Sequence, residues 1–283
     1  MPFVPMSELL AEAYAAGYAV PGFCVWCPEA MQTVLSVAAE MRAPVILMNG
    51  PAEFPLLSPS TLAAAAHELV ERFPVRAALH LDHGESPERV RQCLDVGYTS
   101  VMLDYSTRSL EENTAAVRQV CALAHPLGVT VEGEIGVVGK VSSGAVEGGE
   151  APALTDPAQA AEYAVATGVD ALAVAIGNAH GHYARLPRLD FGLLARLRDA
   201  VTVPLVLHGG SGTPDADLQR AISLGIAKVN VATDLVAAVR DSLLRQWQAG
   251  RNPWIPSAQA EAMAAMAEVV AGWFRRTDAA GRA

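Results

Sequence analysis

Residues 79–86, LHLDHGES, place a carboxylate beside an imidazole at the point where an apolar run ends. Asp82 and His83 are poor core residues, because ionisable side chains are seldom fully buried without partners. An imidazole in such a place suits a metal ion, and a neighbouring carboxylate can move a proton to or from an oxygen. The chemistry available here depends on which other polar groups the fold brings to the same point.

Two further histidines also follow apolar runs. His180 comes after DALAVAIGNA, and His208 comes after PLVL. Three imidazoles that arrive from different strands, with a fourth position left open, are typical of a catalytic zinc site. Other divalent ions that accept imidazole stay open as alternatives. We therefore predict a metal site made by His83, His180 and His208, with Asp82 beside it.

The other histidines have less specific interpretations. His80 points inward together with Asp82 if the strand alternates regularly, so it is either a hydrogen-bonded core residue or a support for the site. His182 lies just beyond the predicted ligands and is interpreted as a surface residue rather than as a ligand. His67 and His125 fall on predicted helices, where we expect them to be solvated.

The loops after the last two apolar runs are suited to a phosphate group. Their sequences are HGGSG at 208–212 and NVATD at 230–234. Backbone amides near helix N-termini bind phosphate oxygens without any lysine. GGSG alone would be a weak signal, because it is also a linker sequence, but here it follows a histidine and accompanies a second polar loop. A metal, a carboxylate and a phosphate site together suit the making or breaking of a carbon–carbon bond next to a phosphorylated ketone.

Eight apolar runs rich in Val, Ile and Leu position these residues, as expected of strands buried on both faces. They are residues 18–25, 44–49, 76–83, 98–104, 128–135, 170–177, 204–209 and 227–233. Helix-like stretches lie between them, several with a capping residue before Pro or a closing Gly. Eight alternations predict an α/β fold, a (β/α)8 TIM barrel, with its chemistry at the carboxyl ends of the strands. The alternative, an open doubly wound sheet, would usually carry GxGxxG after its first strand, and VPGFCVWCPE has none.

The whole chain, residues 1–283, is predicted to be a single barrel domain. Residues 257–276 are predicted to form a C-terminal helical extension that packs on a partner subunit, with Trp273 and Phe274 as candidate contacts. The insert at 136–155 is dominated by glycine and serine, and we expect it to be a mobile loop over the barrel mouth.

Composition narrows the classes of partner. The chain is 52% hydrophobic and 18% charged, its formal net charge is −10, and its pI is near 5.1. Because no run of Lys or Arg stands out, we expect neither nucleic acid nor a membrane as the main partner. The N-terminus has no secretory-signal pattern, and no apolar run approaches the ~18 residues of a membrane span. These features predict a cytoplasmic protein.

Lysine and cysteine usage argue against two other chemistries. Lys140 and Lys228 are the only lysines, and Lys228 opens the last strand, which places it towards the opposite rim of the barrel. A Schiff-base mechanism, which needs a lysine in the barrel mouth, is therefore not favoured. Cys24 and Cys27 form CVWC, a spacing that also occurs in redox and metal pairs. Two reduced thiols in a cytosolic protein are the favoured interpretation.

Eight segments occur together, in this order: AVPGF, EMRAPVIL, LHLDHG, SVMLD, VEGEIG, GNAHGHY, LVLHGGSG and KVNVATD. In these segments, over nearly the whole chain, the sequence resembles the class II, metal-dependent fructose-bisphosphate and tagatose-bisphosphate aldolase family. The resemblance implies an aldolase, a homodimer or homotetramer, that cleaves a phosphorylated ketose reversibly to dihydroxyacetone phosphate and an aldehyde. It implies Zn²⁺ on His83, His180 and His208, and Asp82 as the acid/base at the oxygen of the broken bond. The dihydroxyacetone phosphate site that it implies consists of Gly181, Gly209, Gly210, Ser211, Asn230, Ala232 and Thr233.

Some positions depart from the family pattern. Cys24 and Cys27 stand where the family usually has asparagines, and Tyr105 stands where a small residue is common. A tyrosine at this place would narrow or reshape the mouth.

The most consequential departure is in the loop after the fifth strand. Ser142 stands at the place of the loop glutamate that is the family's proposed base for the carbon-bound proton, and Glu147 or Glu150 are candidates to replace it. An alternative function is therefore a metal-containing phospho-sugar-binding protein that lacks this base. A barrel metallohydrolase is a third hypothesis, but such enzymes typically place His-x-His at the end of the first strand, where CVWC has no histidine.

Overall fold

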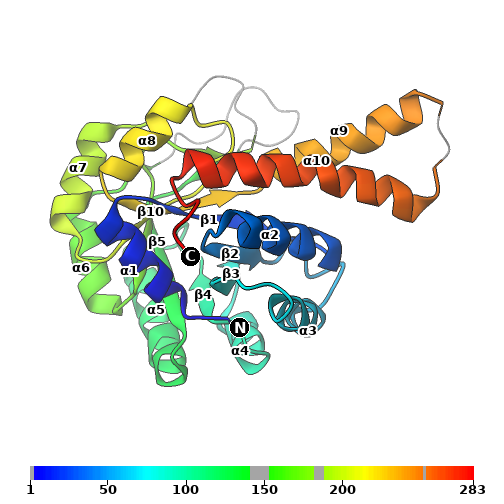
Figure 1. Cartoon of the computed structure of the whole chain (residues 1–283). Coiled ribbons are helices and arrows are strands. Elements are labelled where there is room, and N and C mark those ends of the chain that lie inside the picture. The colour runs from blue at the N-terminus through cyan, green and yellow to red at the C-terminus, as the bar shows by residue number, and fades with distance from the viewer. Residues whose placement is uncertain (1–2, 141–152, 182–187, 251–252) are drawn as a thin grey trace.

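A closed barrel of eight parallel strands organises the protein (Figure 1). The computed structural model describes residues 3–140, 153–181, 188–250 and 253–283. The barrel strands are β1 Val20–Cys24, β2 Val45–Asn49, β3 Ala77–Gly84, β4 Ser100–Leu103, β5 Thr130–Ile135, β7 Ala171–Val174, β9 Leu205–Leu207 and β10 Ile226–Val231. Their order around the barrel is β1-β10-β9-β7-β5-β4-β3-β2. Each strand lies within a predicted apolar run or extends beyond it by a single residue, so the predicted (β/α)8 TIM barrel is confirmed.

Most helices follow a barrel strand and cover the outside of the barrel, whereas α1 precedes the first strand (Figure 1). They are α1 Met6–Ala16, α2 Pro28–Met41, α3 Pro59–Val70, α4 Pro87–Asp95, α5 Leu110–Ala124, the short η1 His125–Leu127, α6 Pro157–Thr167, α7 Phe191–Ala200, α8 Asp215–Ser223, α9 Thr233–Gln248 and α10 Ile255–Arg276. The predicted caps are present: the Ser86 side chain accepts a hydrogen bond from an α4 amide, and Asp156 accepts two at the start of α6. Such caps satisfy amides that have no partner inside the helix.

The strands are apolar because helices cover one face and the barrel interior covers the other. All residues of β2 and of β7 are buried. The barrel closes between β10 and β2 through β1, where Gly22 lies opposite Asn230 on one side and Ile46 on the other. This closure brings the end of the last strand next to the ends of the first three.

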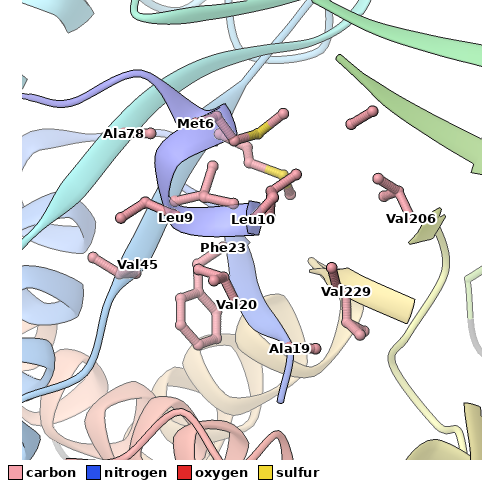
Figure 2. Packing of buried hydrophobic residues seen from close by; sticks show 14 of the residues in the cluster. Met6, Leu9, Leu10, Ala19, Val20, Phe23, Val45, Ala78, Val206 and Val229 are labelled. Carbon is pink, nitrogen blue, oxygen red and sulfur yellow. The ribbon is translucent and has the colours of Figure 1, made fainter. Parts of the chain in front are cut away.

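The amino-terminal end of the barrel is covered by α1, a helix that the sequence patterns above do not predict. The amide of Val4 donates to the carbonyl of Ala77, and the amide of Ser7 donates to Thr130 Oγ1, both at 2.9 Å. Ala77 and Thr130 are the first residues of their strands, so α1 lies at the start of the barrel. Its Leu9 is fully buried with the neighbouring apolar side chains in Figure 2. The opposite, carboxyl end is therefore the one available to a substrate.

The C-terminal helix α10 packs on α9 and α2 (Figure 1). Trp273 and Phe274 are 1% and 0% exposed, and the Phe274 ring meets Phe23 edge-on at 5.4 Å. The expectation that these two aromatic residues contact a partner subunit is wrong, because they anchor the tail to the chain's own barrel. Among the helices that the structure describes, none has the length and apolar character required to cross a bilayer.

Two short strands lie outside the barrel. β6, Gly139–Lys140, pairs in parallel with β8, Ala179–His180, so the chain after β5 lies beside the chain after β7. The sequence does not predict this pair, because two residues are too few for a periodic signal. The expected mobile loop over the mouth falls mainly on residues 141–152, which lie outside the described part of the chain.

Candidate active site

The end of β3 carries the first pair of polar residues and is irregular. Leu81 pairs with Val101 and Gly84 with Leu103, so β3 contains one more residue than β4 over this stretch. His83 lies in the extra stretch with φ +47°, a left-handed conformation that non-glycine residues seldom adopt. A β-bulge of this kind re-aims side chains. It lets the consecutive residues Asp82 and His83 both face the mouth, whereas regular alternation would send them to opposite faces.

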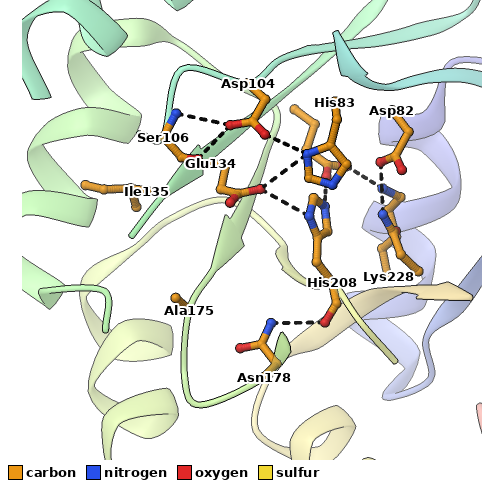
Figure 3. Close-up of polar contacts among 12 residues, drawn as sticks. Asp82, His83, Asp104, Ser106, Glu134, Ile135, Ala175, Asn178, His208 and Lys228 are labelled. Atoms are coloured by element: carbon orange, nitrogen blue, oxygen red, sulfur yellow. Dashed lines mark hydrogen bonds and ion pairs between the residues drawn. The ribbon is translucent and has the colours of Figure 1, made fainter. Parts of the chain in front are cut away.

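Asp82, His83 and His208 converge at the carboxyl end of the barrel. One ligand atom from each lies within 4.8 Å of the others, and the His83 and His208 rings meet edge-on at 4.8 Å (Figure 3). The structure thus brings together two of the three predicted imidazoles, and the carboxylate beside them. For His180 it gives the backbone in β8, but the side chain lies outside the described part. Two imidazoles and a carboxylate within this distance are a donor set that suits zinc or another imidazole-accepting divalent ion.

Each of the two imidazoles is oriented by a carboxylate. His83 Nδ1 lies 2.7 Å from Asp104 Oδ2, and His208 Nε2 lies 2.8 Å from Glu132 Oε1. Asp104 is held in turn by the amide and hydroxyl of Ser106, at 3.1 and 2.6 Å. A carboxylate that accepts one ring N–H leaves the other nitrogen able to bind a metal. Sequence patterns alone assign no role to Asp104 or Glu132.

Glu134 is a further carboxylate at the mouth. Its Oε2 lies 3.1 Å from His208 Nδ1 and 4.0 Å from His83 Nδ1. With His83 and Asp104 it forms a second group of ligand atoms within 4.8 Å of one another. Glu134 is two residues after Glu132 on β5, so both side chains face the barrel interior.

The charges around the cluster determine its protonation. Burial alone would raise the pKa of Asp82, but the imidazoles of His83 and His208 and the Lys228 ammonium outweigh it and lower that pKa to about 2. Asp82 Oδ1 also accepts a hydrogen bond from Asn230 Nδ2 at 3.0 Å. Asp82 is therefore ionised at neutral pH and ready to accept a proton.

Burial and carboxylates act in opposite directions on the imidazoles. Burial alone would lower the pKa of His208, but hydrogen bonds to Glu132 and Glu134 raise it to about 10. For His83, burial is outweighed by the charge of Asp82 and the bond to Asp104, and its pKa is raised. The carboxylates that stabilise an imidazolium here would equally stabilise a cation between the rings.

His80 takes the role of a hydrogen-bonded core residue. It is fully buried, and its Nδ1 lies 2.7 Å from Ser100 Oγ. Burial, together with the Lys228 charge, lowers the pKa of His80 to about 3, so it is neutral. Its Nε2 is 3.9 Å from Asp82 Oδ1 and 3.8 Å from Glu132 Oε2, beyond direct hydrogen-bond reach. His80 supports the site from below and is not in the ligand cluster.

The prediction that Lys228 lies towards the opposite rim of the barrel is wrong. It is the third residue of β10, and its fully buried side chain lies inside the barrel, with Nζ 2.7 Å from Glu132 Oε2. An ammonium in an ion pair with a carboxylate is not a nucleophile. The argument against a Schiff base therefore rests on this ion pair rather than on position.

The two loops predicted to bind phosphate lie side by side. The Gly210 amide donates to the Asn230 carbonyl at 2.9 Å, and the Asp234 amide donates to Ser211 Oγ at 3.2 Å. A side chain at Gly210 would clash with Val229, so only glycine permits this contact. Because the Gly210 amide is already bonded, Gly210 contributes close packing, not a hydrogen bond to a ligand.

Three of the remaining predicted binding residues belong to these two loops. Gly209 has a left-handed φ of +64°, and Ala232 and Thr233 lie at the start of α9, whose positive end faces the same opening. Gly181 follows β8 with φ +101°. This arrangement of glycines and a helix N-terminus can bind an anion, as the sequence predicts.

The departures noted in the sequence include the two thiols of CVWC and the loop after β5. Cys24 Sγ lies 3.4 Å from Glu53 Oε1, and all four cysteines are free thiols, as the favoured interpretation of CVWC expects. Ser142, Glu147 and Glu150 lie outside the described residues.

Comparisons with known proteins agree with this geometry. A family model described as fructose-bisphosphate aldolase class-II matches residues 4–282. The chain is 40% identical over 250 residues to the D-tagatose-1,6-bisphosphate aldolase subunit GatY of Klebsiella oxytoca, a match that covers 88% of this chain and 87% of the relative. The crystal structure of the YdjI aldolase from Escherichia coli K12 superposes with a TM-score of 0.89 at 34% identity, covering 99% of each chain. The fructose-bisphosphate aldolase of Campylobacter jejuni, at 22% identity, has a TM-score of 0.84 over 100% of this chain and 97% of that one, which is evidence for the fold alone.

Proposed function

Because the chain belongs to the class II fructose-bisphosphate aldolase family, it is an aldolase, a carbon–carbon lyase, and we propose how its residues perform the cleavage. The proposed cofactor is one Zn²⁺ held by His83, His180 and His208. The proposed reaction is the reversible cleavage of a phosphorylated ketose to dihydroxyacetone phosphate and an aldehyde. Ketose 1,6-bisphosphates are the first substrates to test, since the GatY relative is named for tagatose 1,6-bisphosphate.

The observation that carries the proposal is the convergence of Asp82, His83 and His208 at the carboxyl end of the barrel. The zinc ion, when bound, polarises the ketone carbonyl and stabilises the negative charge that develops on its oxygen. Asp104 and Glu132 hold the two imidazoles in place, so that little reorganisation is needed when substrate binds.

Asp82 is proposed as the acid/base of the reaction. In the cleavage direction its carboxylate accepts the proton of the hydroxyl group whose carbon becomes the aldehyde, and the electron pair of the broken bond passes to the ketone half. In condensation the same carboxyl group returns the proton to the new hydroxyl group. The hydrogen bond from Asn230 at 3.0 Å supports this role, because it fixes the carboxylate beside the imidazoles.

The phosphate of the ketone half is proposed to bind at the two adjoining loops. The proposed site consists of Gly181, Gly209, Gly210, Ser211, Asn230, Ala232 and Thr233, and in it Gly210 lets the two loops pack closely and does not donate to the phosphate. Glycine backbone and the N-terminus of α9 supply hydrogen-bond donors and positive potential to such a group. Homodimer or homotetramer assembly and a cytoplasmic location stay predictions from the sequence.

Substitution Asp82→Ala tests the proposed acid/base. We expect the variant to retain zinc and to lose cleavage by roughly 10²–10⁴-fold, the usual contribution of a positioned acid/base. Zinc content is measured by atomic emission and cleavage by coupled detection of dihydroxyacetone phosphate. Asp199→Ala, which removes a side chain that is 68% exposed on α7, serves as the control and should be fully active. An Asp82→Ala enzyme that cleaves at the wild-type rate would end this assignment.

Proton exchange tests whether the chain supplies a base for the carbon-bound proton. An active aldolase exchanges a proton of dihydroxyacetone phosphate with solvent deuterium even when no aldehyde is present. We expect zinc-dependent exchange, detected by NMR, that chelation abolishes. Tight binding of dihydroxyacetone phosphate without exchange would instead support the alternative of a phospho-sugar-binding protein.

A further inference from the structure

A layer of ionisable side chains is buried in the barrel directly below the candidate metal ligands. His80 on β3, Glu132 on β5 and Lys228 on β10 are all 0% exposed. Apolar residues of similar size could fill this space, and burying charges is costly unless they are paired and hydrogen-bonded. Packing alone therefore does not explain why these three positions carry ionisable side chains.

The contacts of Glu132 connect this layer to the site. Lys228 Nζ donates to Glu132 Oε2 at 2.7 Å, and His208 Nε2 lies 2.8 Å from Glu132 Oε1. Each oxygen of the Glu132 carboxylate thus has its own partner: Oε2 binds the Lys228 ammonium, and Oε1 binds the His208 imidazole. The second nitrogen of His208, Nδ1, faces Glu134 at the mouth, at 3.1 Å.

We propose that Lys228 is a positioning residue for the metal site, which acts through Glu132 to hold the His208 ring with Nδ1 directed at the cation. This inference rests on the proposed function, because it presumes that His208 binds the metal. A carboxylate can only accept hydrogen bonds, so Glu132 keeps a proton on His208 Nε2. Nδ1, which faces Glu134, would give up its own proton to a bound cation and offer its lone pair to the metal. Lys228 fixes the carboxylate by binding its other oxygen, which prevents rotation about the terminal bond.

A purely structural ion pair makes a different prediction. Its loss would reduce stability and would leave the metal affinity of the folded protein unchanged. A positioning role predicts that zinc affinity and ligand geometry change even in a variant whose stability has been restored. The two roles are separated by measuring metal binding and unfolding on the same variants.

The test uses Lys228→Met and the double variant with Lys228→Met and Glu132→Gln. The single variant leaves a buried carboxylate without its ammonium, so its stability is expected to fall. In the double variant the two replaced side chains are uncharged and close in volume to the original pair, so the protein should fold well. Because a carboxamide can donate as well as accept, it no longer determines which nitrogen of His208 carries the proton.

Zinc affinity is measured by competition with a chromophoric chelator, and ligand geometry by the visible absorption of the Co²⁺-substituted protein. For both variants we expect zinc to bind roughly 10–100-fold more weakly, as is usual when a partner of a metal ligand is lost. The cobalt absorption bands should also shift. Wild-type zinc affinity and an unchanged cobalt spectrum in the double variant would overturn the proposal.

Two controls make the result specific. Thr167→Val removes a buried hydrogen bond of 2.6 Å within α6, outside the barrel, and should reduce stability without changing zinc affinity. If zinc affinity falls in Thr167→Val as much as in Lys228→Met, affinity merely follows stability and the proposal is wrong.

The second control, His83→Ala, tests the metal site itself. Wild-type zinc affinity in His83→Ala would refute the proposed metal site. If His83→Ala loses zinc but both Lys228 variants bind it with wild-type affinity, only the positioning role is refuted.

Discussion

His83 combines an unfavourable backbone conformation with a functional position. Its φ of +47° is rare for a residue with a side chain, and such strain commonly occurs at binding and catalytic sites. The next residue, Gly84, has no room for a Cβ, which would clash with the carbonyl oxygen of Met102. The sequence Asp-His-Gly is therefore explained residue by residue: a proton carrier, a ligand turned towards the mouth, and a glycine that lets β3 rejoin β4.

The thiols of CVWC are predicted to be unreactive at neutral pH. Burial, together with the charges of Glu53 and Asp82, raises the pKa of Cys24 well above its ordinary value, and burial raises the pKa of Cys27 to about 11. Because only the thiolate reacts, alkylation of Cys27 by iodoacetamide at pH 8 should be roughly a hundredfold slower than that of free cysteine. Mass-spectrometric mapping of the alkylated sites between pH 7 and 11 measures this.

The same shifts have a consequence for stability. A thiol whose pKa is higher in the folded than in the unfolded chain stabilises the fold below the unfolded pKa, and this contribution is lost as pH rises through the folded pKa. We therefore expect the free energy of unfolding to decrease between about pH 9 and pH 11 in part because of Cys24 and Cys27, and less so in a Cys24→Ala, Cys27→Ala variant. Rapid alkylation of either residue at pH 7 would show instead that CVWC is a reactive pair.

At the scale of elements, periodicity predicts strands well and their irregularities poorly. The eight apolar runs predict the eight barrel strands, because strands buried on both faces need continuous apolar sequence. The bulge at the end of β3 has no such signal, since it depends on pairing with β4. Regular alternation places Asp82 inward correctly, but it does not explain why His83 also faces the mouth.

The helix α10 supports the site from outside the barrel. Trp273 Nε1 donates to Asp234 Oδ2 at 3.0 Å, and Asp234 is in the first turn of α9, next to the proposed phosphate loop. Trp273→Phe keeps an aromatic ring but removes this hydrogen bond to a carboxylate. We expect it to lower the free energy of unfolding by about 1.5–3 kcal/mol, the usual range for a bond to a charged group. Chemical denaturation measures the change.

The kinetic effect of Trp273→Phe should follow from the position of Asp234. Because the start of α9 shifts, KM for a phosphorylated ketose should rise more than kcat falls. Trp247→Phe on α9 is the matched control, since Trp247 is 45% exposed, and it should leave both stability and KM unchanged. Equal effects of the two substitutions would show that α10 does not support the loop.

At the scale of the whole molecule, the sequence predicts which polar residues reach the mouth but not how they are connected. Asp82, His83 and His208 are recognisable because each ends an apolar run. The pairings of Lys228 with Glu132, 96 positions apart, and of His83 with Asp104 depend on barrel closure and on the position of each side chain within its strand. A lysine that opens an apolar strand looks peripheral in sequence, yet the inward-facing positions of β10 place it in the centre of the barrel.

The metal should also stabilise the fold as a whole, because its ligands come from strands that are far apart in the chain. At free zinc about 100 times its dissociation constant, binding to the folded state alone contributes about 2.7 kcal/mol. In a domain of this size, we expect that to raise Tm by about 4–8 °C relative to the chelated protein, as measured by calorimetry. His208→Ala should abolish the increase, and Mg²⁺ should not reproduce it, because magnesium prefers oxygen ligands. A zinc-dependent increase of the same size in His208→Ala would show that His208 does not hold the ion, because any ion that binds the folded state alone raises Tm.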